Sequence, residues 1–228
     1  MEAAAEHGVD LVEPSSINSR RTHILNAART VFADRGSLDA GMREIATRAG
    51  CTTGAIYSVF SGKEDIYAVL LGQSLDDLTA AVSIASARHP DAVTSLRAAA
   101  SAFLGYYLDH EFEYKLGLHQ FHGGQGPDLD KHRDQELNAK VGRVIDVFEA
   151  GFTRVDTQRP PAGHNPRDRA EALFMSLIGV FTMVHTRRVK SVGVSPDAVV
   201  ETLLDTFCGP TETSPSQHLD PTKESTSE

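Results

Sequence analysis

Residues 52–58 carry the side chains best suited to binding another molecule. Small or short polar residues predominate there: Thr52, Thr53, Gly54, Ala55 and Ser58. At the start of a helix, such residues let the unpaired N–H groups and the dipole of the helix N-terminus approach a phosphate or the floor of a groove. The pattern therefore predicts recognition of a phosphate-bearing surface.

No catalytic motif accompanies this stretch. The chain lacks P-loop, G-x-G-x-x-G, G-x-S-x-G, H-E-x-x-H and paired-cysteine patterns. His119 and His122 could share a metal on one helix face, but no third ligand has convincing spacing. Cys51 and Cys208 lie far apart in sequence, which is typical of a reducing cytoplasm. We expect no enzymatic activity, no metal site and no cofactor.

Three short helical patterns position residues 52–58. Residues 20–34 and 42–48 have apolar residues at helical spacing, and a turn at Gly50 follows them. Thr52 or Thr53 then caps a third helix. Two short helices joined by a glycine-containing turn have the layout of a helix-turn-helix.

This segment resembles the tetracycline-repressor (TetR) family of bacterial transcriptional regulators over about residues 20–71. The matching residues, in register, are Arg43-Glu44-Ile45-Ala46, Ala49-Gly50, Gly54, Tyr57, Phe60 and Lys63-Glu64. The resemblance implies an all-α homodimer. An N-terminal three-helix helix-turn-helix would bind DNA, and a larger C-terminal helical domain would bind a ligand and dimerise.

The resemblance also implies a DNA-binding surface on the third helix. We expect four residues nearest the bases, namely Thr52, Thr53, Ala55 and Ser58, and four on phosphates, namely Arg43, Gly54, Tyr57 and Lys63. The chain departs from the family pattern at Ala40 and Gly41, where a Thr or Ser cap is usual, at Thr53, where Lys or Arg is frequent, and at Val59, where an aromatic residue is frequent. Thr and Ser read bases weakly, so specificity should depend partly on DNA shape.

Charge is distributed unevenly along the 228 residues, whose net charge is −9. Residues 1–17 contribute −4, whereas residues 20–65 carry seven Lys or Arg against five acids, for +2. This asymmetry is typical of a protein with a basic DNA-binding segment and an acidic effector domain. Arg20 and Arg21 open the first helix, either as a solvated helix start or as contacts to DNA. No apolar run reaches ~18 residues and no signal peptide is evident, so we expect a cytoplasmic protein.

The rest of the chain is also predicted to be helical. Ser61-Gly62-Lys63-Glu64 reads as a capping box that starts a long helix over residues 62–87. Further helices are expected over 91–109, 128–152, 166–190 and 195–207. The expected domains are a disordered arm (1–17), the helix-turn-helix domain (18–65), a ligand-binding and dimerisation domain (66–208) and a disordered tail (209–228).

Aromatic and histidine side chains are frequent in the second half of the chain. They are either core residues or the lining of an effector pocket, because ligand sites are mainly apolar with a few polar groups. The candidate pocket residues are Phe103, Tyr107, His110, Phe121, Phe148, Phe174 and Phe181. The last two helices either pair with those of a second subunit, as the family implies, or pack on their own subunit.

The sequence therefore predicts a ligand-responsive transcriptional repressor that binds a palindromic operator as a homodimer and is released by a small-molecule effector. An activator of the same family is not distinguished by sequence. The alternative from another class is a small-molecule-binding or protein-interaction module that keeps its helix-turn-helix only as a structural unit.

Overall fold

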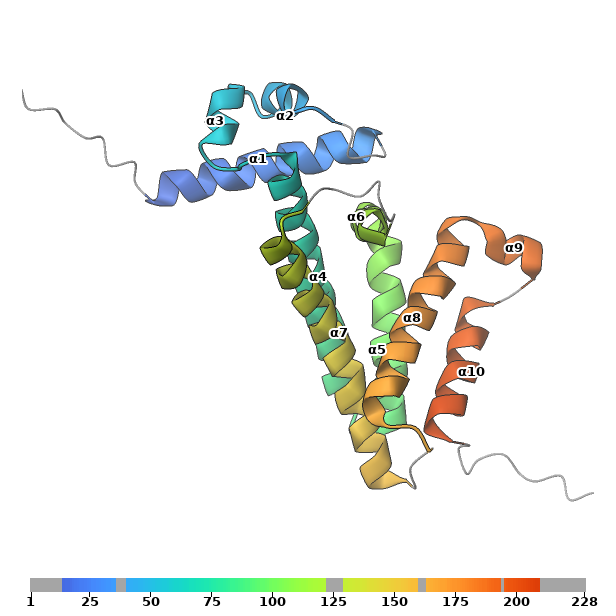
Figure 1. Ribbon diagram of the computed structural model, residues 1–228. Helices are drawn as coiled ribbons and strands as arrows, with labels where there is room; N and C mark the ends of the chain where they lie inside the picture. Colours follow the sequence, from blue (N-terminus) through green and yellow to red (C-terminus); the bar gives the residue numbers. More distant parts are fainter. Residues whose placement is uncertain (1–13, 36–39, 122–128, 160–162, 194, 210–228) are drawn as a thin grey trace, which may run out of the picture. The chain divides into compact units, whose positions relative to one another are not determined.

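The computed structural model of the protein describes residues 14–35, 40–121, 129–159, 163–193 and 195–209. Within these ranges every regular element is an α-helix, which confirms the predicted all-α class (Figure 1). The helices are α1 (Pro14–Arg35), α2 (Met42–Arg48), α3 (Thr53–Tyr57), α4 (Lys63–Ala87), α5 (Ala92–Asp109), α6 (Glu111–Phe121), α7 (Lys131–Gln158), α8 (Pro166–His185), α9 (Arg188–Val192) and α10 (Pro196–Cys208).

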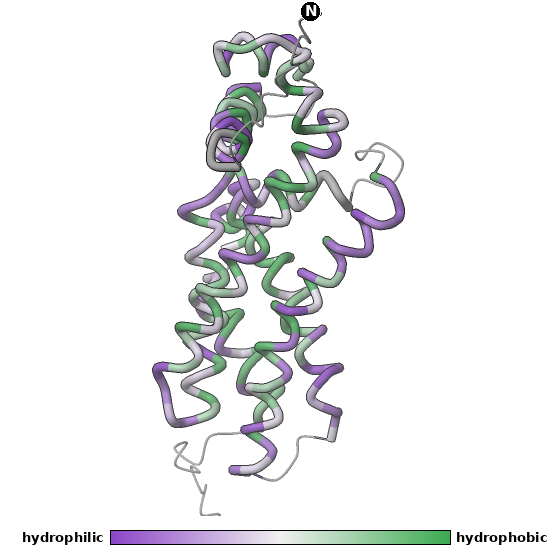
Figure 2. Tube along the Cα trace, turned by 90° about the vertical axis from the view of Figure 1, so that its left-hand side faces the viewer, coloured by the Kyte–Doolittle hydropathy of each residue, from purple (hydrophilic) through white to green (hydrophobic). Residues whose placement is uncertain are grey.

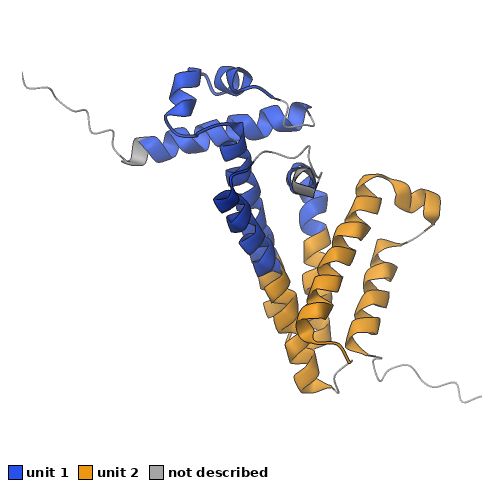
Figure 3. Cartoon of the chain, viewed as in Figure 1, with its two compact units in different colours: residues 1–81, 105–144 blue, residues 82–104, 145–228 orange. Residues whose placement is uncertain are grey.

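The chain divides into two compact units (Figure 3). Unit 1 comprises residues 1–81 and 105–144, and unit 2 comprises residues 82–104 and 145–228. The predicted domain boundary between residues 65 and 66 does not coincide with this division. Unit 1 extends further because α4, α6 and α7 contribute apolar residues to the same core as α1–α3.

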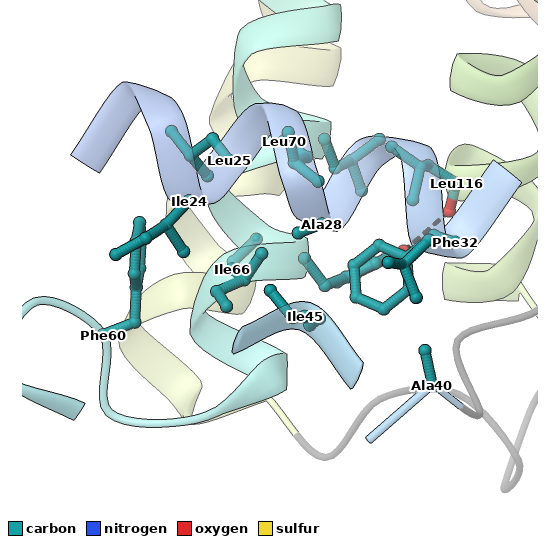
Figure 4. Packing of buried hydrophobic residues seen from close by; sticks show 14 of the residues in the cluster. Ile24, Leu25, Ala28, Phe32, Ala40, Ile45, Phe60, Ile66, Leu70 and Leu116 are labelled. Atoms are coloured by element: carbon teal, nitrogen blue, oxygen red, sulfur yellow. Dashed lines mark hydrogen bonds between the residues drawn. The ribbon is translucent and has the colours of Figure 1, made fainter. Parts of the chain in front are cut away.

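The core of unit 1 is an apolar cluster centred on α1 (Figure 4). Helix α3 has five residues, and an isolated helix of fewer than ~12 residues is marginal in water. Burial of Ile56 and Phe60 in the cluster therefore positions α3. The side chains that meet there include Ile24, Leu25, Ala28, Phe32, Ile45, Ile66, Leu70 and Leu116.

Unit 2 has a core of its own, which is rich in aromatic rings. The Phe103 ring lies 5.8 Å from that of Phe174 and 6.4 Å from that of Phe148, centroid to centroid. Close packing of α5 on α7 depends on Gly151, since a Cβ atom there would lie 2.5 Å from Cδ2 of Leu96. Apolar residues alternate with hydrophilic ones along the helices, as amphipathic packing requires (Figure 2).

One helix within the described ranges, α4, is long and apolar enough to cross a membrane by length and composition. Its residues Ile66, Leu70 and Leu71 are buried in the core of unit 1. The same composition is expected of a core helix.

Most predicted helix starts are confirmed. The Thr52 hydroxyl accepts a hydrogen bond from the Ala55 N–H at 3.2 Å and caps α3. Asn165 caps α8, with Pro166 in the first turn as predicted. Ser195 caps α10 through the Ala198 N–H.

The predicted capping box at residues 61–64 is wrong in its partners. The carboxylate that accepts from the Ser61 N–H, at 2.9 Å, belongs to Asp65 and not to Glu64. The Ser61 hydroxyl also donates to Asp65, at 3.2 Å. Helix α4 begins at Lys63, so Asp65, and not Glu64, is its third residue. The third position is the one from which the carboxylate of a capping box reaches back to the preceding loop.

Several helix bounds differ from the predicted ones. Helix α1 begins at Pro14, so the last residues of the predicted disordered arm are helical. The predicted helix over residues 166–190 is divided because Arg187 adopts a left-handed conformation (φ 57°) that ends α8. Residues 1–13 and 210–228, predicted to be disordered, lie outside the described residues.

Candidate nucleic-acid interface

Helices α2 and α3 form the predicted helix-turn-helix. Gly50, between them, has φ +60°, a conformation that glycine adopts without a Cβ penalty. Gly41 is the N-cap of α2 and provides no side-chain hydrogen bond, as its residue type requires. The turn is closed by the Cys51 N–H, which donates to the Ala46 carbonyl at 3.0 Å.

Two ion pairs and a histidine hold α2 against α1, and sequence reasoning missed all three. Arg35 donates to Glu44 through two nitrogens, at 3.1 and 2.9 Å. Arg48 pairs with Asp34 at 2.7 Å, and His23 Nε2 lies 3.0 Å from the Ala49 carbonyl. These contacts join residues from different helices, so no fixed sequence spacing indicates them.

The predicted DNA-contacting residues all reach the surface of unit 1. Tyr57 is 57% exposed although its neighbour Ile56 is fully buried, so Tyr57 is not a core residue. The exposed members of the predicted set are Arg43, Thr52, Gly54, Tyr57 and Ser58, and the half-buried members are Thr53, Ala55 and Lys63.

Two of the predicted phosphate ligands have no competing acid among the described residues. Arg43 and Lys63 form no ion pair with any residue in the described ranges, whereas Arg29 pairs with Glu113. The Arg21 guanidinium lies over the Phe60 ring, 4.7 Å from its centroid, and is therefore held against another residue of unit 1. A cation without a protein partner loses no ion pair when it binds a phosphate.

The predicted pocket residues fall into two groups. Phe103, Phe148 and Phe174 form the aromatic cluster of unit 2. In unit 2 the Phe181 ring stacks on His185, with centroids 6.3 Å apart. Sequence reasoning did not separate these residues from those in unit 1.

The remaining pocket candidates belong to unit 1. Tyr107 is buried, and burial raises the pKa of its hydroxyl. His110 is exposed, stacks on Tyr106 with centroids 4.3 Å apart, and places Nδ1 2.7 Å from the Tyr106 carbonyl oxygen. The side chain of Phe121 lies outside the described residues.

Two surface hollows are lined by residues other than the predicted pocket residues. A groove of about 240 Å³ lies between α4 and α7 in unit 1. A wider hollow of about 510 Å³ lies beside α9 in unit 2. The groove is lined by Ala68, Val69, Gly72, Gln73, Asp76, Arg133, Glu136, Leu137 and Lys140, and the hollow by Val184, Arg187, Val189, Lys190 and Pro196.

Within the described part of the chain, no group of three or more His, Cys, Asp or Glu side chains could hold a metal. The side chains of His119 and His122, the predicted candidates, lie outside it. Cys51 and Cys208 are both free, and burial raises the pKa of the Cys208 thiol to about 11.

Family models match both parts of the chain. A model described as bacterial regulatory proteins, tetR family, matches residues 24–70. A second, described as tetracyclin repressor-like, C-terminal domain, matches residues 96–207. Together the two matches span well over half of the chain.

Individual relatives are named as helix-turn-helix (HTH)-type transcriptional regulators. The HTH-type transcriptional activator FasR of Mycolicibacterium smegmatis is 39% identical over 100 residues, which is 43% of this chain and 45% of FasR. The HTH-type transcriptional repressor KstR2 of Rhodococcus jostii is 39% identical over 66 residues, 29% of this chain and 32% of KstR2. The aligned region thus spans less than half the length of either relative.

The fold is shared with a solved regulator. FadR from Bacillus subtilis, solved in complex with stearoyl-CoA, superposes with a TM-score of 0.65 at 16% identity. The superposition covers 83% of this chain and 98% of FadR. At this identity it shows the fold alone.

Proposed function

The chain belongs to the tetR family of bacterial regulatory proteins, and we propose that it is a cytoplasmic, ligand-responsive transcriptional regulator that binds a palindromic operator as a homodimer. One observation carries this proposal. Tyr57 at the end of α3 and its C-cap Ser58 are exposed, and the cations Arg43 at the start of α2 and Lys63 at the start of α4 have no acid partner within the described ranges.

Helix α3 is the proposed reader of the DNA major groove. Thr52, Thr53, Ala55 and Ser58 lie nearest the bases, and their short side chains allow close approach to a thymine methyl group. Arg43, Gly54, Tyr57 and Lys63 hold phosphates. Since phosphate contacts fix the register but carry no sequence information, specificity depends on a few weak base contacts and on DNA shape.

The proposed homodimer forms through α8 and α10. Met175, Gly179 and Met183 are four residues apart on α8 and therefore share one face, and all three are exposed. Met175 is 73% and Met183 37% exposed, so this one face presents two large apolar side chains to solvent. Pairing of this face with its two-fold mate would bury it. For a helix-turn-helix dimer, half-sites about one DNA turn, ~34–36 Å, apart are expected.

The proposed effector is a small molecule with a large apolar part. The aromatic cluster of Phe103, Phe148 and Phe174 is the predicted lining, because ligand sites in proteins are mainly apolar. FadR was solved with stearoyl-CoA, so a long-chain acyl-CoA is the first compound to test. Stabilisation against heat by stearoyl-CoA, and release of DNA at the same concentration, would support it. Neither effect with a series of acyl-CoA chain lengths would exclude this class.

Activation is the second candidate outcome of operator binding. The relative FasR is an activator, whereas KstR2 is a repressor. The position of the operator distinguishes the two, because a repressor site overlaps the promoter and an activator site lies upstream of it. A reporter fused to the flanking promoter, with and without the gene, measures the sign directly.

The first test is fluorescence anisotropy of the protein on DNA that flanks its own gene, at two salt concentrations. Nanomolar binding at two chains per duplex, weakening steeply with salt, is expected. Lys63→Gln should weaken binding, whereas Arg143→Gln, which removes an exposed cation on α7 that pairs with Asp76, should not. Equal micromolar binding to every duplex, unaffected by Lys63→Gln, would favour the alternative of a purely structural helix-turn-helix.

The dimer is tested separately by sedimentation. Met175→Glu places a charge on the proposed α8 face and should yield a folded monomer. An unchanged dimer would place the interface elsewhere.

A further inference from the structure

Asp65 is a buried carboxylate in the first turn of α4. The residue is 8% exposed and accepts three hydrogen bonds. The Ser61 N–H and hydroxyl donate at 2.9 and 3.2 Å, and Nη1 of Arg133, in the first turn of α7, donates at 2.6 Å. Burial of an ionised carboxylate is costly unless it is paired and hydrogen-bonded, and Asp65 is both.

The Asp65 contacts fix the loop that joins α3 to α4. Phe60, in this loop, is 1% exposed and lies in the core of unit 1. The next residue, Ser61, is held by Asp65 through both its backbone and its side chain. Gly62 has no side chain with which to cap α4, and Lys63 follows immediately. The loop therefore owes its fixed conformation to Phe60 on one side and to Asp65 on the other.

Arg133 extends this arrangement to α7. Its Nη1 donates to Asp65, and its Nε donates to Asp130 at 3.1 Å. The Arg133 side chain is 29% exposed and the Asp65 side chain 10% exposed, so water screens this pair less than it screens a surface ion pair. A segment 68 residues further along the chain thus sets the position of the loop beside the DNA reader.

We propose that Asp65 is a positioning residue for DNA recognition: held by Arg133, it fixes the Ser61–Gly62 loop so that Lys63 meets a DNA phosphate. The inference rests on the proposed function and adds a residue that does not itself touch DNA. The inference also means that the first turn of α7, through Arg133, helps to position a DNA-contacting residue. Any change that draws Arg133 away from Asp65 loosens Lys63.

A second ion pair between the same two helices provides a matched control. Asp76 on α4 pairs with Lys140 and Arg143 on α7. It lies eleven residues beyond Asp65 on the same helix, about 16 Å along the axis at 1.5 Å per residue. The Asp76 side chain is exposed and contacts no residue of the α3–α4 loop. Removal of its charge tests the joining of α4 to α7 without disturbing the loop.

The experiment measures operator affinity and its salt dependence by anisotropy for five full-length proteins: wild type, Asp65→Asn, Asp76→Asn, Lys63→Gln and the Asp65→Asn/Lys63→Gln double variant. Asp65→Asn should weaken binding about tenfold, equal to about 1.4 kcal/mol. It should lower the slope of log K against log salt as much as Lys63→Gln does, ~0.9 per lost phosphate contact. In the Lys63→Gln background, Asp65→Asn should cost less than threefold. Asp76→Asn should match wild type in both quantities.

Two results would overturn the inference. One is wild-type affinity and slope in Asp65→Asn. The other is a loss of threefold or more when Asp65→Asn is added to Lys63→Gln, because the residue would then act through general stability. If circular dichroism shows that Asp65→Asn is unfolded, Arg133→Gln takes its place under the same criteria, since Asp65 keeps its Ser61 donors. Failure of the wild type to prefer any operator would instead refute the proposed function, which is a separate result.

Discussion

Replacement of Arg169 by methionine should destabilise unit 2 by about 3 kcal/mol. Arg169 is 2% exposed, pairs with Asp156 and donates to the Phe207 carbonyl at 3.0 Å. Its guanidinium also lies 4.9 Å from the centroid of the Phe152 ring. Removal of one partner of a buried ion pair costs roughly 3–5 kcal/mol, because the other charge stays buried and unpaired. The low end applies here, since the Asp156 side chain is 20% exposed.

The same argument predicts that a double replacement is far milder. Asp156 Oδ1 and Arg169 Nε have no hydrogen-bond partner within the described residues, so the pair is imperfectly satisfied. Arg169→Met/Asp156→Leu should therefore be within about 1 kcal/mol of wild type, since apolar replacement of a buried pair is often neutral. Arg97→Met, which breaks the more exposed pair with Glu201, should cost below ~1 kcal/mol.

Urea unfolding followed by circular dichroism measures these differences. The Arg169→Met midpoint should fall well below those of wild type and the double variant, with Arg97→Met close to wild type. A single variant as stable as wild type would mean that the ion pair between α8 and α7 contributes little to stability. A double variant as unstable as the single one would mean that the cost comes from the other contacts of Arg169, which are the hydrogen bond to the Phe207 carbonyl and the packing on Phe152.

Three further predictions concern single residues. Hydrogen bonds from Thr94 lower the pKa of Asp91, which caps α5. The stabilisation from this cap is therefore present above about pH 4 and is lost as pH falls through the lowered pKa. Asp91→Ala should cost about 1 kcal/mol of unfolding free energy at pH 7 and less at pH 3, as measured by urea unfolding. A thiol reagent at pH 8 should modify half-buried Cys51 before Cys208, whose pKa of about 11 keeps it protonated, and Cys51→Ser should abolish the fast phase. Tyr57→Ala should weaken operator binding about fivefold and leave the dimer intact by size exclusion, whereas a monomeric or unfolded product would contradict its exposed position.

Features set by neighbouring residues were predictable from sequence. The caps at Thr52, Asn165 and Ser195 depend on a short polar side chain just before a helix, and each is confirmed. The capping box failed because Glu64 and Asp65 are both acidic and adjacent. Only the three-dimensional path of the loop decides which of them reaches Ser61.

Contacts between distant residues were not predictable. Arg29 and Glu113 are 84 residues apart and Asp65 and Arg133 are 68 apart, and the sequence contains no periodic signal that joins them. The break after α8 was missed for another reason. A left-handed residue usually means glycine, and here it is Arg187. The DNA-contacting and pocket residues named from sequence stay predictions.

The charge of the DNA reader sets how strongly binding should depend on salt. Of the seven cations between residues 20 and 65, Arg29, Arg35 and Arg48 are in ion pairs and Arg21 lies over the Phe60 ring. Arg20, Arg43 and Lys63 are left for phosphates. The proposed homodimer carries these three cations on each of its two helix-turn-helix segments. The slope of log K against log salt should therefore be about −5, at ~0.9 per phosphate. A slope near −2 would mean one contact per segment, and a slope near −9 would mean that the α1–α2 ion pairs open on DNA. The measured slope therefore tests whether the ion pairs seen here persist in the complex.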